Sequence, residues 1–391
     1  MSDTVLYIHP VAQAPSVWGM SLSERIQKQC QKKELISKSQ CVDSIAELAA
    51  REEKTALIMR GDCAYDDAVI AGLLGKTDII LVNDKGNILG AHVAKDKADT
   101  VRVWLDGALN QDAVDLNGFD VITPEQAGGA YRDELRKRED PYALIVSVDG
   151  DNATSTARAI EWRLYKGSYK GVTDLVTKYV WPVPAFHVTK LCVKYKFSPN
   201  MVTTVGAILM LLALYLFWQG HYATGLLAGW VMTFLDTVDG KLARVTLTSS
   251  KFGNIFDHGI DLIHPPFWYL AWGYGLYLNA HMIDLARLET LVNLMFCFYI
   301  LGRLCEGYFI WRFGVHIHVW RRIDSWFRLI SSRRNPNMII LSFYLFIGRP
   351  DIGFTVIVMW SIATFVIHIV QIIQAEFSNR KASLRSWLRP A

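Results

Sequence analysis

Six long apolar stretches in the C-terminal half of the chain constrain its fold more than any other feature. They cover residues 200–219, 222–245, 254–279, 287–312, 336–349 and 352–375. Most of them reach the ~20 residues that a helix needs to cross the hydrocarbon core of a bilayer. The fifth is short and is extended here to begin near Ile330. The sequence therefore predicts an all-α domain of six transmembrane helices.

The distribution of charge supports a membrane protein with an aqueous front domain. The chain has 391 residues, of which 51% are hydrophobic and only 20% charged, whereas soluble proteins carry about 25% charged residues. Residues 1–150 hold 17 Lys+Arg and 24 Asp+Glu (net −7), and residues 151–391 hold 24 and 13 (net +11). This composition argues against a wholly soluble, disordered or nucleic-acid-binding protein. Cationic residues collect in alternate loops, so the positive-inside rule predicts a multi-pass protein of the cytoplasmic or inner membrane with both termini cytosolic.

The front of the chain has the pattern of an α/β domain. Short β-rich runs at 5–8, 55–60, 78–83 and 143–148 alternate with amphipathic helical segments such as 22–33 and 44–53. The N-terminus lacks a basic segment followed by an apolar one, so no signal peptide is expected. We predict four regions: a cytosolic α/β domain (1–155), juxtamembrane interfacial helices (156–198), the six-helix domain (199–378) and a basic cytosolic tail (379–391).

The juxtamembrane region is rich in aromatic residues and lysines. Its amphipathic aromatic side chains are suited to the depth of the lipid headgroups, and they are Trp162, Tyr165, Tyr169, Tyr179 and Trp181. We expect its lysines to face anionic lipid.

Four carboxylates in the apolar half identify the candidate site. Asp236 and Asp239 are three residues apart, and Asp257 and Asp261 are four apart, so each pair shares one helix face. Charged residues at membrane depth are costly and usually functional. Four acidic side chains on neighbouring helices need cations to neutralise them, and carboxylates without His or Cys favour Mg²⁺, Mn²⁺ or Ca²⁺ over zinc.

Small and basic residues around the carboxylates suggest a phosphorylated ligand. Gly240, Gly253 and Ala243 allow close approach, and Arg244 is suited to a phosphate that bridges the metal ions. These residues predict a divalent-metal site for a phosphorylated substrate, opening toward the cytosol.

Other polar residues of this half leave alternatives open. Arg303 either pairs structurally with Glu306 or binds the phosphate of an acceptor. Lys251, Arg333 and Arg334 either bind phosphate or set the topology. The histidines fall into two groups: a core or interfacial role is expected for His258 and His264, and no metal-binding companions are evident for His316 and His318.

The complete pattern D-x2-D-G-x2-A-R-x8-G-x3-D-x3-D, which runs from Asp236 to Asp261, resembles the signature of the CDP-alcohol phosphotransferase (CDP-alcohol phosphatidyltransferase) family at every position. The resemblance covers about residues 185–375. It implies a membrane enzyme of phospholipid biosynthesis that transfers a substituted phosphate from a CDP-linked donor to an alcohol and releases CMP. Two Mg²⁺ or Mn²⁺ ions and a homodimer are also implied.

The resemblance also assigns roles to the motif residues. It implies that Asp236, Asp239 and Asp257 bind metal, and that Asp261, the fourth carboxylate of the same metal site, acts as the general base. The CDP site is expected to comprise Asp236, Asp239, Gly240, Ala243, Arg244 and Gly253. Lys251, Arg303, Arg333 and Arg334 are the candidates for a phosphate on the acceptor.

The front domain resembles a degenerate sugar-nucleotide nucleotidyltransferase. Residues 19–25 (GMSLSER) and 59–62 (MRGD) correspond to its glycine-rich loop and strand-ending Gly-Asp, but the segment lacks closely spaced glycines and has no lysine before Lys28. We therefore expect the CDP donor to be made elsewhere and to be CDP-diacylglycerol, with a CDP-polyol as the alternative. An ion-coupled transporter is the alternative of a different class, but the carboxylates lie near one membrane face and the chain has no repeated halves.

Overall fold

A computed structural model describes residues 3–11, 15–107, 111–128, 141–146, 155–169, 171–249, 251–379 and 383–388, without the side chains of residues 251, 252 and 254–258. The chain divides into two compact units. The first contains the described residues up to Ser168 together with Val245–Leu247, and the second begins at Tyr169. Each unit is described by itself.

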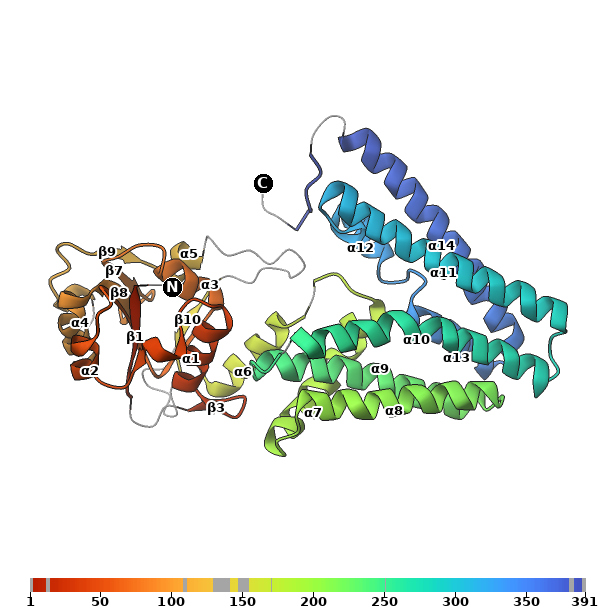
Figure 1. Cartoon of the computed structure of the whole chain (residues 1–391), viewed down its shortest axis with the longest axis horizontal. Coiled ribbons are helices and arrows are strands. Elements are labelled where there is room, and N and C mark those ends of the chain that lie inside the picture. Colours follow the sequence, from red (N-terminus) through yellow and green to blue (C-terminus); the bar gives the residue numbers. More distant parts are fainter. Residues whose placement is uncertain are drawn as a thin grey trace. The chain divides into compact units, whose positions relative to one another are not determined.

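The N-terminal unit is built on a six-stranded mixed sheet (Figure 1). Its strands, in spatial order, are β4 (Cys41–Val42), β1 (Thr4–His9), β5 (Thr55–Arg60), β8 (Ile88–Ala94), β7 (Ile79–Val82) and β9 (Asp120–Ile122). β1 pairs in parallel with β4 and β5, and β8 runs antiparallel to both of its neighbours. Two small sheets accompany it, β2 (Ser16–Val17) with β3 (Met20–Ser21) and β6 (Cys63–Tyr65) with β10 (Ala143–Ile145).

Helices pack on both faces of this sheet because the buried strands are apolar on both sides. They are α1 (Leu22–Lys32), α2 (Ile45–Ala50), α3 (Asp67–Leu73), α4 (Ala98–Asp106) and the short α5 (Pro124–Ala127). Along β1, Leu6 faces a core that includes Ile26 of α1, while Val5 faces a separate core that includes Val101 of α4. Successive side chains of one strand therefore pack into two different hydrophobic cores, one on each face of the sheet. The predicted α/β architecture is confirmed.

Two local predictions need correction. The segment 143–148 was expected as one of the runs of the main α/β sheet, but β10 pairs antiparallel with β6 outside the main sheet, and residues 147 and 148 lie outside the described part. Tyr165 was expected at headgroup depth. It lies instead on α6 (Ala157–Gly167), fully buried, with its ring 6.2 Å from that of Trp18.

The second unit is helical. Two elements precede its long helices, the π-helical turn Val176–Val180 and α7 (Pro182–Lys194). The long helices are α8 (Pro199–Trp218), α9 (Tyr222–Val245), α10 (Lys251–Leu278), α11 (Leu285–Phe313), α13 (Arg334–Phe346) and α14 (Pro350–Asn379). A connection with the short turns η6 (Ile317–Val319) and α12 (Arg322–Phe327) joins α11 to α13.

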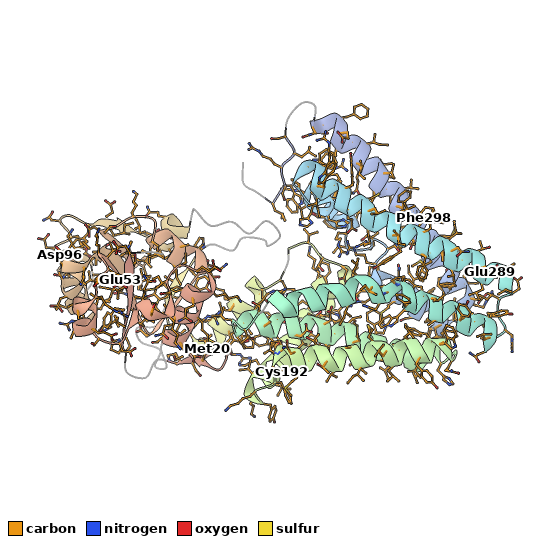
Figure 2. The ribbon with its side chains drawn as sticks, in the orientation of Figure 1. Met20, Glu53, Asp96, Cys192, Glu289 and Phe298 are labelled. Atoms are coloured by element: carbon orange, nitrogen blue, oxygen red, sulfur yellow. The ribbon has the colours of Figure 1, made fainter. Side chains whose placement is uncertain are left out.

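The sequence explains where these helices begin and how closely they pack. Ser198 caps α8 by accepting a hydrogen bond from the Met201 amide, and Pro199 occupies the first turn, where its missing N–H costs nothing. α8 lies against α10 so closely that a Cβ on Gly275 would come within 2.2 Å of the Phe217 carbonyl oxygen. α11 runs along α14, where Phe298 (labelled in Figure 2) stacks edge-on with Phe365.

Three helices of this unit, α8, α11 and α14, are long and apolar enough to cross a membrane. Their outward faces carry large exposed apolar side chains such as Leu211, Leu304 and Met359, as lipid-facing helices do. The second unit therefore belongs in a membrane. The count of six spans stays a prediction for α9, α10 and α13.

Candidate active site

A cavity of about 490 Å³ opens among the helices of the second unit. It is lined by three carboxylates, Asp174, Asp236 and Asp261, and by six cationic side chains, Lys241, Arg244, Arg303, Arg328, Arg333 and Arg334. Its size falls within the range of small-molecule sites. The excess of cationic side chains gives the cavity the electrostatics of a site for a polyanion.

The cavity gathers most of the residues that the sequence singles out. Its lining contains Asp236, Gly240, Arg244, Asp261, Arg303, Arg333 and Arg334. Asp239 and Ala243 lie on α9 between these motif residues without lining the cavity, and Gly253 lies in the first turn of α10. The side chains of Lys251, Asp257 and His258 lie outside the described part of the structure.

Asp239 is buried between α9 and α8, outside the cavity lining. It is 5% exposed, and its Oδ2 accepts a hydrogen bond of 2.6 Å from the Thr203 hydroxyl on α8. Its Oδ1 is buried, and no hydrogen-bond partner among the described residues reaches it. A buried carboxylate oxygen without a donor is costly, so this atom is suited to a ligand beyond the described side chains.

Arg334 links the two motif helices. It is the first residue of α13, and its Nη2 lies 2.6 Å from Oδ2 of Asp236 on α9, while its Nη1 lies 2.6 Å from Oδ1 of Asp261 on α10. One guanidinium therefore bridges the carboxylates of two helices. The arrangement demonstrates that these two carboxylates converge on one cation.

The donor set fits a hard divalent cation. Asp236 and Asp261 converge on a positive charge, Asp239 keeps an unsatisfied buried oxygen beside them, and all the donors are carboxylate oxygens. Such oxygens are what Mg²⁺ and Mn²⁺ prefer. Among the described side chains, those that fit such an ion are Asp236, Asp239 and Asp261. The side chain of Asp257, the fourth predicted ligand, lies outside the described part.

Three arginines form a second cationic wall of the cavity. Arg303 comes from α11, and Arg328 and Arg333 come from the connection before α13. Each has a buried donor without a hydrogen-bond partner among the described residues: Arg303 Nε, Arg328 Nη1 and Arg333 Nε. Burial, followed by the positive charge of Arg333, lowers the pKa of Arg328 to about 9. Buried cations with spare donors are stabilised by an anion that brings several oxygens.

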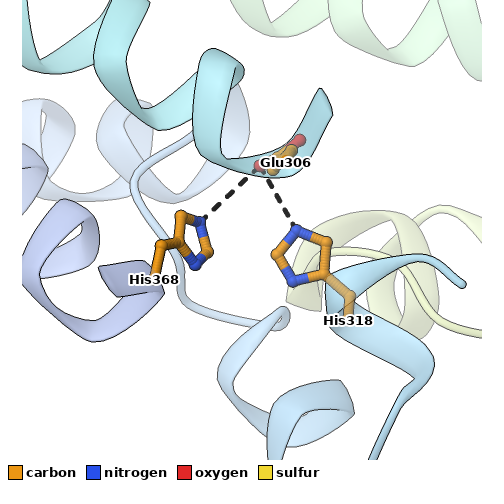
Figure 3. A group of neighbouring side chains, drawn as sticks. All are labelled: Glu306, His318 and His368. Atoms are coloured by element: carbon orange, nitrogen blue, oxygen red, sulfur yellow. Dashed lines mark hydrogen bonds and ion pairs between the residues drawn. The ribbon is translucent and has the colours of Figure 1, made fainter. Parts of the chain in front are cut away.

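Glu306 holds two of these arginines in place through ion pairs. Its carboxylate pairs with Arg303, at 2.7 Å, and with Arg333. The same Oε1 lies 3.3 Å from Nε2 of His318 and 3.7 Å from Nε2 of His368, which approach from η6 and α14 (Figure 3). Arg303 therefore pairs with Glu306 and also lines the cavity, and its binding of an acceptor phosphate stays a prediction.

The Glu306, His318 and His368 side chains also have the donor types of a transition-metal site, with all three ligand atoms within 4.8 Å of one another. Two arginines already share the carboxylate, however, so the group carries a net positive charge before any ion is added. We therefore interpret it as an ion-pair network. Burial lowers the pKa of His318 to about 3, so this imidazole is neutral near pH 7.

Several site residues escaped the sequence analysis. Lys241 occupies a variable motif position and lies 3.3 Å above the Tyr169 ring, while Asp174 accepts a 3.0 Å hydrogen bond from Asn335. His318, expected to lack companions, has two in Glu306 and His368. The only available signal was the position of Lys241 inside the motif and of Arg328 in a basic loop, because folding alone brings the others together.

In the N-terminal unit, the strand-ending Asp62 is engaged by its own chain. It is 7% exposed and accepts hydrogen bonds of 2.9 and 2.7 Å from the guanidinium of Arg60. An aspartate paired in this way is a poor metal ligand unless Arg60 moves. The resemblance to a degenerate nucleotidyltransferase stays a prediction.

Comparison with known proteins places the helical unit in a family. Relatives include an archaetidylinositol phosphate synthase of Pyrococcus horikoshii (38% identity over 79 residues, 20% of this chain and 42% of the relative). A choline/ethanolaminephosphotransferase of Arabidopsis thaliana is 39% identical over 88 residues (19% and 22%). A phosphatidylinositol phosphate synthase of Mycobacteroides abscessus is 33% identical over 86 residues (20% and 39%).

The chain spans less than half the length of these curated relatives. Residues 196–368, which include the whole motif and every arginine of the cavity, match the family model of the CDP-alcohol phosphatidyltransferases. The family acts on CDP-linked donors and alcohol acceptors in membranes and generally depends on divalent metal. The chain thus carries a CDP-alcohol phosphatidyltransferase domain, of a transferase family of phospholipid biosynthesis.

Proposed function

We propose that this protein is a membrane phosphotransferase that moves a substituted phosphate from a CDP-linked donor to an alcohol and releases CMP. The supporting observation is the cavity in which Asp236 and Asp261 face a wall of cationic side chains. A diphosphate needs positive charge along its length, and an attacking hydroxyl needs a carboxylate base. Both are available within one cavity.

The reaction assigns distinct tasks to the chain's own residues. Asp261 takes the proton of the acceptor hydroxyl, whose oxygen forms a bond to the phosphorus distal to the cytidine. The bond between that phosphorus and the bridging oxygen breaks, and the electron pair leaves with CMP. Arg244 and Lys241 offset the negative charge that develops on the leaving phosphate. Asp236, Asp239 and Asp257, together with Asp261 at the same site, would hold Mg²⁺ or Mn²⁺, which would supply charge stabilisation on the diphosphate when bound.

The arginine wall supports an acceptor that carries a phosphate of its own. Arg303, Arg328 and Arg333 each offer one buried donor that no described residue engages, and Glu306 fixes two of these arginines. These arginines are separate from the motif carboxylates on α9 and α10, so they suit a second anionic group beside the diphosphate. The names of two relatives, archaetidylinositol phosphate synthase and phosphatidylinositol phosphate synthase, contain a phosphorylated polyol.

We assign the donor as a CDP-linked lipid such as CDP-diacylglycerol, since the cavity lies in the membrane unit and the acceptor wall suits a small phosphorylated alcohol. The alternative is a CDP-polyol or CDP-amino-alcohol donor with a lipid acceptor, as the name of the choline/ethanolaminephosphotransferase relative suggests. Cytosolic termini, six spans and a homodimer belong to the same proposal.

The test is CMP release by the purified full chain in lipid vesicles with Mg²⁺ and CDP-diacylglycerol. Acceptors are offered in matched pairs, inositol against inositol phosphate and glycerol against glycerol phosphate, with and without EDTA. We expect metal-dependent release that requires the phosphorylated member of one pair. Asp239→Ala is the inactive control because this residue has the unsatisfied oxygen of the proposed metal site.

The alternatives give different results. Release of CMP with diacylglycerol and a CDP-polyol would reverse the assignment of donor and acceptor. Absence of CMP release with every donor would contradict the enzyme proposal, and ion-driven uptake by the same vesicles would then favour a transporter.

A further inference from the structure

We propose that Arg334 is a built-in competitor of the metal ion: its guanidinium holds the Asp236 and Asp261 carboxylates together and must leave them before a divalent cation can bind there. This inference rests on the metal site of the proposed function. It adds a role that the motif does not contain, because Arg334 lies 73 residues beyond Asp261.

The geometry points to competition. The two nitrogens of one guanidinium each lie 2.6 Å from a carboxylate oxygen, one on α9 and one on α10. The oxygens are therefore used by Arg334 in the same place where a metal ion would use them. A divalent cation and a guanidinium cannot both occupy the short space between two converging carboxylates.

Burial makes the contact strong. The Arg334 side chain is 14% exposed and that of Asp236 is 20% exposed, whereas that of Asp261 is 43% exposed. Solvent screens the Arg334–Asp236 pair less than the Arg334–Asp261 pair, because both side chains of the first pair are largely buried. The ion must therefore displace a largely desolvated pair on the α9 side, and a looser one on the α10 side.

The Arg334 side chain can also be accommodated elsewhere in the cavity after it leaves the two carboxylates. It lines the cavity together with Arg303, Arg328 and Arg333, each of which has one buried donor without a partner among the described residues. A guanidinium released from the carboxylates remains in a cavity suited to phosphate groups. Metal binding would thus convert Arg334 from a partner of the carboxylates into a ligand for the anionic substrate.

The test measures Mn²⁺ binding to the full-length protein in lipid by electron paramagnetic resonance, without substrate or turnover. We expect Arg334→Gln to bind Mn²⁺ at least tenfold more tightly than the wild type, because the competing cation is gone. Arg334→Lys keeps the charge but presents one compact donor group in place of a fork, so an intermediate affinity is expected.

A matched control separates competition from a general change in the electrostatic field. Arg328→Gln removes the same charge from the same cavity. In the described part of the structure, the guanidinium that contacts both aspartates is that of Arg334, so the effect of Arg328→Gln should stay below threefold. Adding millimolar guanidinium chloride to Arg334→Ala should weaken Mn²⁺ binding again and leave the wild type unchanged, at constant ionic strength. The addition compares one folded variant with itself, so a difference in stability between variants does not affect the result.

Three results would overturn the proposal: equal Mn²⁺ affinity in wild type and Arg334→Gln, a shift of equal size in Arg328→Gln, or weaker binding in Arg334→Gln. Absence of Mn²⁺ binding by both proteins would overturn the metal site and the competition together. Tighter binding in Arg334→Gln without CMP release from any donor would support the competition while contradicting the proposed function.

Discussion

Replacing Glu306 by glutamine would remove the carboxylate that joins two arginines and two histidines. Glu306 pairs with Arg303 at 2.7 Å and with Arg333, and the side chain is only 15% exposed. The substitution keeps size and shape, so no cavity arises. It leaves two arginines side by side in a largely buried site without their shared counter-charge.

The expected cost follows from these contacts. Removing one partner of a buried ion pair costs about 3–5 kcal/mol, because the remaining charge is left uncompensated. The amide oxygen of glutamine still accepts one hydrogen bond, which recovers about 1 kcal/mol. We therefore expect the free energy of unfolding to fall by about 3 kcal/mol.

The measurement is unfolding of the full chain in mixed micelles by titration with SDS, followed by circular dichroism of the helical unit. Glu376→Gln is the matched control. Glu376 also joins α11 to α14 through an arginine, Arg312, but these side chains are 34% and 41% exposed. Loss of that exposed pair should cost less than about 1 kcal/mol. Equal losses in the two variants would refute the reasoning, and so would a metal ion retained by the wild type and released by Glu306→Gln.

Three further predictions address the base, the anion wall and the front domain. Asp261→Asn should lower CMP release at least about a hundredfold by removing the base, while equilibrium dialysis shows CDP binding within threefold of wild type; wild-type turnover would exclude Asp261 as the base. Arg328→Gln should raise KM for a phosphorylated acceptor about tenfold and leave KM for the CDP-linked substrate unchanged, because it removes a buried N–H group from the second cationic wall. A parallel rise in both KM values would contradict a separate binding site for the acceptor phosphate. In the N-terminal unit, the hydrogen bond from Lys97 lowers the pKa of Asp78 below its usual 3.8, so the pair stabilises above that pH and the benefit is lost as the pH falls through the lowered value. Asp78→Asn should therefore speed hydrogen exchange in β7 and β8 at pH 7 and have little effect near pH 2.

The motif and the helix boundaries could be read from the sequence because their signals are local. The run TALIMR became β5 without a shift, and the Ser198–Pro199 pair marks the start of α8. The sequence analysis missed β8 (ILGAHVA) because Gly90 and His92 interrupt its apolar pattern. Gly90 allows close contact with the neighbouring strand β5, and Nδ1 of His92 forms a hydrogen bond with the carbonyl oxygen of Leu73.

The second cationic wall could not be predicted from the sequence, because its residues meet only in the folded chain. Arg328 and Arg333 line the same cavity as the motif residues, and Arg333 and His368 approach Glu306, only through the packing of α11, α13 and α14, at separations that no local pattern records. The sequence marked Arg303 and Arg333 as candidates by charge alone. The sequence already offered Glu306 as a partner for Arg303, but the pairing of Glu306 with Arg333 became visible only when the helices were packed.

The order in which the cavity's walls occur along the chain has a consequence for biosynthesis. The carboxylates lie on α9 and α10, but Arg328, Arg333 and Arg334 follow α11. During synthesis, Asp236 and Asp261 therefore leave the ribosome well before Arg334, which pairs with both of them. A nascent chain ending at Phe313 would hold Asp236 and Asp261 without Arg334, so assembly of the site must wait for the last two helices.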